Sequence, residues 1–223
     1  VKVYKKDNLV YCAHPTSASS LYEDLVIAKK WQKINYEDIC WEQDHVFSYI
    51  MDPISRHCNG LRTDIGKQDV NTQTCIFNNS DLFFADCFIT SYHSIPLWNM
   101  YGKSVYHIDW IPLDLNHVGL DGSDIPTSYH TYLSRKLFEY HNLDICIEEI
   151  EEFDNLSRKR NIQNSNYDNL MAKIKHNINN NSLGAGSSGL YVSLQNDFDV
   201  YHSVIDKIHH WEETWNRISW LYK

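Results

Sequence analysis

The chain has 223 residues, of which 43% are hydrophobic and 13% aromatic, and a formal net charge of −9 from 20 basic and 29 acidic side chains. This composition excludes a disordered or fibrous protein, and the acidic balance argues against general nucleic-acid binding, which needs a basic surface. No apolar run approaches the roughly twenty residues of a membrane span, so we expect no membrane association.

The cysteines and histidines form no metal-binding pattern. The six cysteines contain no CxxC pair, and the twelve histidines have neither HExxH spacing nor the spacing of a zinc finger. We therefore expect free thiols in a reducing compartment, the cytoplasm, and no structural metal.

The first informative segment is an apolar strand, Leu9–Ala13, that ends in a turn at Pro15. Apolar residues at near-helical spacing over Ser17–Lys33 predict the helix that follows. Small hydroxyl residues over 16–20 stand at the entrance of this helix, where parallel α/β sheets bind phosphate. Ordinary helix capping by serine is the alternative.

The second informative segment repeats this order. Val46–Ile50 predicts a buried strand, and Pro53 suits the first turn of a helix that runs to about Leu61. Arg56 lies near the start of that helix, where a guanidinium can hold a phosphate with two hydrogen bonds. A salt bridge to Asp52 or another surface acid is the alternative. Two such sites, about one crossover apart, predict a ligand with two separate phosphate groups.

The rest of the chain completes one α/β domain over residues 1–223. The apolar run over Ser80–Thr90 fits a strand or a helix, because periodicity alone does not distinguish them, and of the two we favour the helix. After it we expect a strand over Ser104–Ile111, a helix over Ser128–Tyr140, a short strand over Asp144–Ile150, a short helix over Tyr167–His176 and a final helix over Asp197–Tyr222. Residues 154–190 form an Asn-, Ser- and Gly-rich excursion that is typical of a lid or a tolerated insertion. The apolar stripe of the final, tryptophan-bearing helix favours core packing, with an oligomer face as the alternative.

Four segments of the chain resemble the sulfotransferases that use 3′-phosphoadenosine 5′-phosphosulfate (PAPS). Pro15-Thr16-Ser17-Ala18-Ser19-Ser20 is similar to the family loop P-K-[ST]-[GA]-[ST]-[ST] except at its second position, and Asp52-Pro53-Ile54-Ser55-Arg56 keeps the D-P-x-x-R centre of the second family signature. More weakly, Tyr92-His93-Ser94-Ile95-Pro96 looks like the H-x-x-P segment, and Tyr191 with Asn196-Asp197-Phe198-Asp199-Val200-Tyr201 is similar to the family's last helix. The order agrees over Leu9–Tyr201, and the sequence style looks like the divergent sulfotransferase-like proteins of marine bacteriophages.

The resemblance implies a three-layer, P-loop-like α/β fold in which helices flank a short, mostly parallel sheet. It also implies transfer of a sulfuryl group from PAPS to a hydroxyl or amine of a small molecule or glycan, with 3′-phosphoadenosine 5′-phosphate as the product. The resemblance implies that Ser17, Ser19 and Ser20 hold the 5′-phosphosulfate, in a donor-binding loop that also includes Thr16 and Ala18. It implies that Arg56 and Asn59 hold the 3′-phosphate, with Asn59 in the place of a family serine. His93 is the first candidate general base and His14 the second, although either histidine can equally be structural.

Two departures from the family pattern favour a different outcome. Thr16 stands where the family has a lysine that stabilises charge on the leaving phosphate, and Met51 replaces the first arginine of the second signature. Either another cation substitutes, or catalysis has been lost. The candidate cations are Lys29, Lys30, Arg62 and Lys67. The alternative function is a catalytically silent, sulfotransferase-like binding or virion structural protein, located in the host cytoplasm or the virion and assembling through its C-terminal helix.

Overall fold

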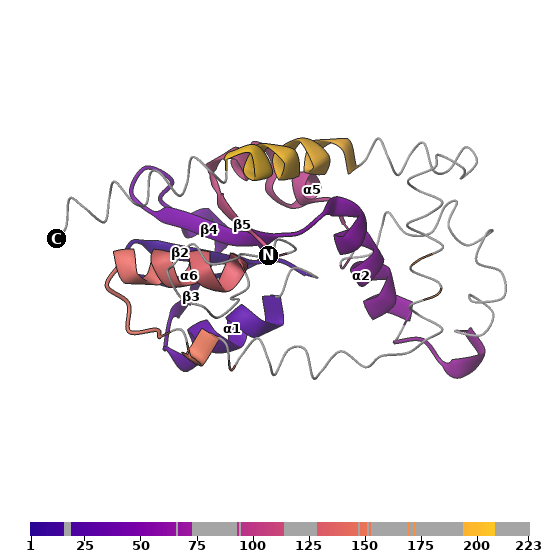
Figure 1. Ribbon diagram of the computed structural model, residues 1–223, viewed down its shortest axis with the longest axis horizontal. Helices are drawn as coiled ribbons and strands as arrows, with labels where there is room; N and C mark the ends of the chain where they lie inside the picture. The colour runs from indigo at the N-terminus through magenta and orange to yellow at the C-terminus, as the bar shows by residue number, and fades with distance from the viewer. Residues whose placement is uncertain are drawn as a thin grey trace. The chain divides into compact units, whose positions relative to one another are not determined.

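The computed structural model describes residues 1–15, 19–65, 67–72, 93, 95–113, 129–146, 148–150, 152, 169, 172 and 194–207 (Figure 1). Contacts within the chain define two compact units. Unit 1 comprises Val1–Met51, Tyr106–Arg160 and Val200–Lys223, and unit 2 comprises Asp52–Val105 and Asn161–Asp199. The expectation of a single domain over residues 1–223 stays a prediction.

Unit 1 contains a five-stranded sheet with the strand order β3-β1-β2-β4-β5. The strands are β1 (Lys2–Lys6), β2 (Leu9–Ala13), β3 (Gln32–Ile34), β4 (His45–Ile50) and β5 (Asp109–Pro112). β4 runs parallel to both β2 and β5, whereas β1 runs antiparallel to both β2 and β3. The protein is therefore of the α/β class, but its sheet is mixed rather than mostly parallel. The three-layer, P-loop-like fold stays a prediction.

The antiparallel half of the sheet arises from two local features that were not predicted from the sequence. Asp7 and Asn8 form a tight turn between β1 and β2, and Asp7 adopts φ 54°, a left-handed conformation that Asp tolerates. The helix α1 (Ser19–Ala28) ends before the predicted Lys33, because the chain turns at Lys30 (φ 59°) and then pairs β3 with β1. Pairing at the sheet edge thus outweighs continuation of the helix.

The main core of unit 1 lies between one face of the sheet and the helices α1 and α6 (Tyr129–Tyr140), which lie on the same side in Figure 1. Its members include Leu9, Tyr11, Ala13, Phe47, Tyr49 and Ile111 from the strands and Tyr22, Leu25, Val26, Leu133, Leu137 and Phe138 from the helices. The other face carries the alternate residues of the strands, which are also buried, among them Val10, Cys12, Val46 and Ser48. Burial on both faces explains the continuous apolar sequence of β2.

Two strand predictions are wrong in whole or in part. The predicted strand over Ser104–Ile111 is instead a 3-10 helix, η2 (Gly102–His107), followed by β5 from Asp109. The predicted strand over Asp144–Ile150 is absent from the described residues 144–146 and 148–150, of which the last three are helical. Here the chain reverses direction at Asn142 (φ 52°), and the Leu143 N–H donates to the Phe138 carbonyl. Ile145 is buried although it follows this turn and is not part of a strand.

Unit 2 contains the helices that position the candidate site. α2 (Pro53–Ile65) begins at Pro53 as predicted and continues past Leu61, and α5 is a short helix over Leu97–Tyr101. Residues 194–207 are helical, which agrees with the first part of the predicted final helix; the part up to Asp199 belongs to unit 2 and the part from Val200 to unit 1. A short 3-10 helix, η1 (Tyr36–Asp38), belongs to unit 1. The predictions for Ser80–Thr90, for most of 154–190 and for the end of the final helix lie outside the described residues.

Candidate functional site

The residues predicted for catalysis and for donor binding are divided between the two units. His14 belongs to unit 1, whereas Arg56, Asn59 and His93 belong to unit 2. Ser19 and Ser20 open α1, but their side chains lie outside the described structure, as do residues 16–18. Pairing of the serine-lined loop with Arg56 around one ligand therefore stays a prediction.

The start of α2 is capped by its own sequence. Asp52 Oδ1 accepts a hydrogen bond from the Ser55 N–H at 2.8 Å, and the Asp52 carbonyl accepts the Arg56 N–H at 2.8 Å. Proline at the first helical position has no N–H to satisfy. Backbone donors at Ser55 and Arg56 are thus occupied, so an anion at this site would depend on the Arg56 guanidinium rather than on these backbone groups.

The Arg56 side chain is buried without a hydrogen bond. Only 1% of the residue is exposed, and among the described residues its Nε, Nη1 and Nη2 atoms have no hydrogen-bond partner. Its Nη1 lies 3.8 Å from Asp197 Oδ2, which makes an ion pair but is too long for a hydrogen bond. Burial lowers the pKa of Arg56, and the nearby Asp197 opposes that shift. The guanidinium therefore keeps all its donors unused in a place where unpaired charge is costly.

Asp197 is held by α5, which explains why it does not satisfy the arginine. The residue before α5 is Pro96, which provides no side-chain cap. Instead Asp197, 1% exposed, accepts the Leu97 N–H at 2.8 Å and the Trp98 N–H at 3.2 Å. Burial raises the pKa of Asp197, while these N–H groups and Arg56 act in the opposite direction. Residues of the second and fourth sequence segments, and the helix that follows the third, thus meet in unit 2.

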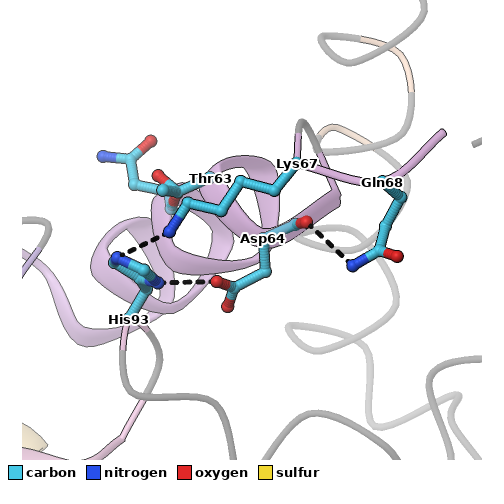
Figure 2. A network of polar contacts seen from close by, with 6 residues as sticks. Thr63, Asp64, Lys67, Gln68 and His93 are labelled. Atoms are coloured by element: carbon cyan, nitrogen blue, oxygen red, sulfur yellow. Dashed lines mark hydrogen bonds and ion pairs between the residues drawn. The ribbon is translucent and has the colours of Figure 1, made fainter.

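His93, the first candidate base, lies in a polar network at the end of α2. Figure 2 shows its imidazole between Asp64 and Lys67. The Nδ1 atom lies 2.6 Å from Asp64 Oδ1, and the Nε2 atom lies 3.3 Å from Lys67 Nζ. A carboxylate only accepts and an ammonium only donates, so Nδ1 carries the proton and Nε2 presents its lone pair. This tautomer is the one that a general base needs.

The other polar groups around this network belong to α2 and the residues that follow it. The Gln68 side-chain amide donates to the Asp64 carbonyl at 3.5 Å, and the Thr63 hydroxyl donates to the Asn59 carbonyl at 2.9 Å. Asn59 is exposed on α2. Its predicted role beside Arg56 stays a prediction.

His14, the second candidate base, lies just beyond the carboxyl end of β2 and is 1% exposed. The Ser48 hydroxyl donates to the Cys12 carbonyl at 2.5 Å, and its oxygen lies 3.1 Å from His14 Nδ1. Because the hydroxyl has a single hydrogen, His14 Nδ1–H must donate to Ser48. The imidazole also meets the Trp110 ring edge-to-face at 5.6 Å. These contacts make His14 part of the buried sheet face.

A histidine pair that was not predicted from the sequence lies at the amino ends of β4 and β5. His45 opens β4 and Asp109 opens β5; His45 Nε2 lies 2.5 Å from Asp109 Oδ2, and its Nδ1 lies 2.8 Å from His141 Nε2. Burial, together with His45, lowers the pKa of His141 to about 4. His141 is therefore neutral near pH 7, and the cluster bears on stability in acid.

The four basic residues that were predicted as possible substitutes for the family lysine lie in different surroundings. Lys29 pairs with Glu149 at 2.8 Å, Lys30 turns the chain after α1, and the Arg62 side chain lies outside the described structure. Lys67 is the candidate that contacts a predicted catalytic residue. The roles of Asp64 and Asp197 were missed, because each meets its partner across a long stretch of sequence that no local pattern links.

In the described parts of the chain, no group of three or more His, Cys, Asp and Glu side chains is arranged to hold a metal ion. None of the described helices combines the length and apolar character needed to cross a membrane. Comparison of the chain with protein-family models, with curated proteins and with solved structures gave no match in any of the three.

Proposed function

We propose that the protein is a sulfotransferase that moves a sulfuryl group from PAPS to a hydroxyl or amine of a small molecule or glycan. The observation that carries the proposal is the buried Arg56 guanidinium, whose donors are unused among the described residues. An anion with several acceptor oxygens supplies the hydrogen bonds that the protein itself does not. Arg56 lies in the D-P-x-x-R segment, where the family resemblance expects the 3′-phosphate.

The surroundings of Arg56 fit an anionic ligand better than a permanent ion pair. A buried ion pair is stabilising only when its geometry is close and its remaining donors are satisfied. Arg56 and Asp197 meet neither condition, since their contact is 3.8 Å and the Asp197 oxygens already accept two backbone N–H groups. A phosphate at the guanidinium would form short, charge-assisted hydrogen bonds and repay the cost of burying the arginine.

His93 is the better of the two candidate bases. Its side chain is 24% exposed and Asp64 fixes its tautomer, whereas His14 is buried against Ser48 and Trp110. In the proposed step, an acceptor O–H or N–H gives its proton to His93 Nε2 as the acceptor atom bonds to sulfur. The bond from sulfur to the 5′-phosphate oxygen breaks, and its electron pair stays on that oxygen. The protein would hold the bound donor in line with the acceptor atom, and such positioning supplies a large part of the catalysis.

A catalytically silent binding protein is the second candidate. Thr16 favours it, because a hydroxyl at the family lysine position cannot supply positive charge to the leaving phosphate. The two candidates make the same prediction for nucleotide binding and opposite predictions for turnover.

Two measurements test the proposal. In a thermal melting experiment, 3′-phosphoadenosine 5′-phosphate should raise the melting temperature of the protein, because a ligand that binds only the folded state stabilises that state. Transfer of radiolabelled sulfate from PAPS to a panel of hydroxyl and amine acceptors should then give labelled product. A melting shift without turnover would favour the silent protein, and no shift at millimolar nucleotide would discard both.

A further inference from the structure

The Lys67 ammonium donates a hydrogen bond to His93 Nε2, the atom with which the proposed base must accept a proton. Lys67 follows α2 and is exposed, and among the described residues its Nζ contacts only His93 Nε2, at 3.3 Å. Asp64 holds the other side of the same ring at 2.6 Å (Figure 2). While Lys67 donates to Nε2, that lone pair cannot accept a proton from a substrate. The network as it stands is an oriented base with its reactive atom covered.

The contact that covers the base is the weaker of the two. The Asp64 hydrogen bond is short and its acceptor is charged, whereas the Lys67 contact is long and its acceptor is the nitrogen of a neutral ring. A lysine on a flexible, exposed stem moves easily, and a phosphate or sulfonate attracts an ammonium more strongly than a neutral imidazole does. An anion that arrives near this end of α2 would therefore draw Lys67 away and leave the Asp64–His93 pair in place.

We propose that Lys67 is an anion-operated cover of the base, which leaves His93 Nε2 when the sulfuryl donor binds and then faces the donor's phosphosulfate. This inference rests on the proposed function, and it names how that site is regulated. Lys67 would supply the positive charge that the family pattern assigns to a lysine and that Thr16, at that position of the sequence, lacks. Coupling the two roles in one side chain means that the base is exposed only when the group to be transferred is present.

The position of Lys67 along α2 is compatible with this role. Arg56 lies in the first turn of α2 and Asp64 in its last, eight residues later, which is roughly 12 Å along the helix axis. A nucleotide that carries one anionic group at Arg56 and a second at its other end can extend along such a span. The two ends of α2 would then each hold one end of the donor.

The cover is testable by the reactivity of His93 itself. Diethyl pyrocarbonate acylates an imidazole nitrogen whose lone pair is accessible. Mass spectrometry of peptides measures the rate of acylation at His93 separately from that at the other histidines. Without nucleotide, Lys67→Ala should raise the rate of acylation at His93 by on the order of five- to tenfold, because it removes the hydrogen bond that the charged Lys67 ammonium donates to Nε2. Lys103→Ala, at an exposed position of η2 in the same unit, is the matched control and should leave the rate unchanged.

Transfer kinetics complete the test. Lys67→Ala should lower kcat by on the order of a hundredfold and Lys67→Arg should restore part of it, while binding of 3′-phosphoadenosine 5′-phosphate through Arg56 persists. Equal labelling of His93 in wild type and Lys67→Ala would overturn the cover, even if the nucleotide binds. If the nucleotide fails to bind wild-type protein, the proposed function itself is wrong, so the two failures are distinguishable.

Discussion

Two buried polar side chains, one in each unit, were both predicted from the sequence to serve the donor site, and their surroundings differ. His14 in unit 1 is 1% exposed and is matched by Ser48, which in turn donates to the Cys12 carbonyl. Arg56 in unit 2 is equally buried, yet among the described residues its guanidinium makes no hydrogen bond. The buried histidine of the sheet therefore has a hydrogen-bond partner within the protein, whereas the buried arginine of α2 has none among the described residues, and we propose a ligand as its partner.

The largest effect expected from this difference is on catalysis. His93→Gln removes the proposed base and should lower kcat by roughly 10²–10⁴-fold, because a glutamine cannot take the acceptor proton. His14→Gln should leave kcat of the folded fraction close to wild type. Steady-state sulfate transfer measures both variants, with circular dichroism to confirm folding. The assignment of the two histidines would be reversed if His14→Gln were the inactive variant.

The fold was predictable where periodicity and burial agree. Leu9–Ala13 was recognised as a strand because both its faces are buried, and Pro53 marked the start of α2 because proline fits a first helical turn. The mixed sheet was missed, since β3 has only exposed and half-buried residues and is specified by its pairing with β1 rather than by its own pattern.

The candidate site was predictable in part. The segment around Arg56 could be recognised, but burial of its side chain depends on tertiary packing that no local pattern shows. Asp197 was part of a quoted motif, yet its role as the cap of α5 follows from Pro96, which lies 101 residues earlier and provides no cap of its own. Asp64 meets His93 only because the chain returns to the end of α2.

The next effect is on stability. Ser48→Ala leaves the buried His14 N–H without its acceptor and should lower the free energy of unfolding by about 1–3 kcal/mol. Arg56→Met fills a similar volume and removes an unsatisfied buried cation, but it also takes the ion-pair partner from buried Asp197. Because that contact is long and Asp197 keeps its two backbone N–H donors, the loss in the free energy of unfolding should stay below the roughly 3–5 kcal/mol expected for breaking a close buried pair. Urea denaturation measures both.

The control for these variants is Ser203→Ala. The Ser203 hydroxyl donates to the Val200 carbonyl within the helix 194–207, so its loss should change stability by less than about 0.5 kcal/mol. Strong destabilisation by Arg56→Met would mean that the arginine is a structural group and would remove the main support for a ligand there.

A smaller effect concerns acid. The pKa of His141 is lowered from 6.5 to about 4 in the folded protein, so below pH 6.5 the unfolded chain binds a proton that the folded chain does not. The stability that this group contributes is fully present above pH 6.5 and is lost as the pH falls toward 4. His141→Gln should flatten this part of the pH profile of unfolding without changing nucleotide binding.

The neighbour that adds to the effect of burial on His141 is His45, at the start of β4. His45 contacts His141 on one side and Asp109 on the other. An unchanged slope in His141→Gln would assign the acid sensitivity to other groups. Nucleotide binding by His141→Gln should equal that of the wild type in either case.

The central claim is that Arg56 receives the 3′-phosphate of the donor, and calorimetric titration with two nucleotides tests it most directly. Wild-type protein should bind adenosine 3′,5′-bisphosphate roughly 10–100-fold more tightly than adenosine 5′-monophosphate, because only the former offers a phosphate to the buried guanidinium. Arg56→Met should abolish this preference and leave the weaker nucleotide's affinity unchanged. Equal binding of the two nucleotides by wild type, or a preference that survives in Arg56→Met, would contradict the account.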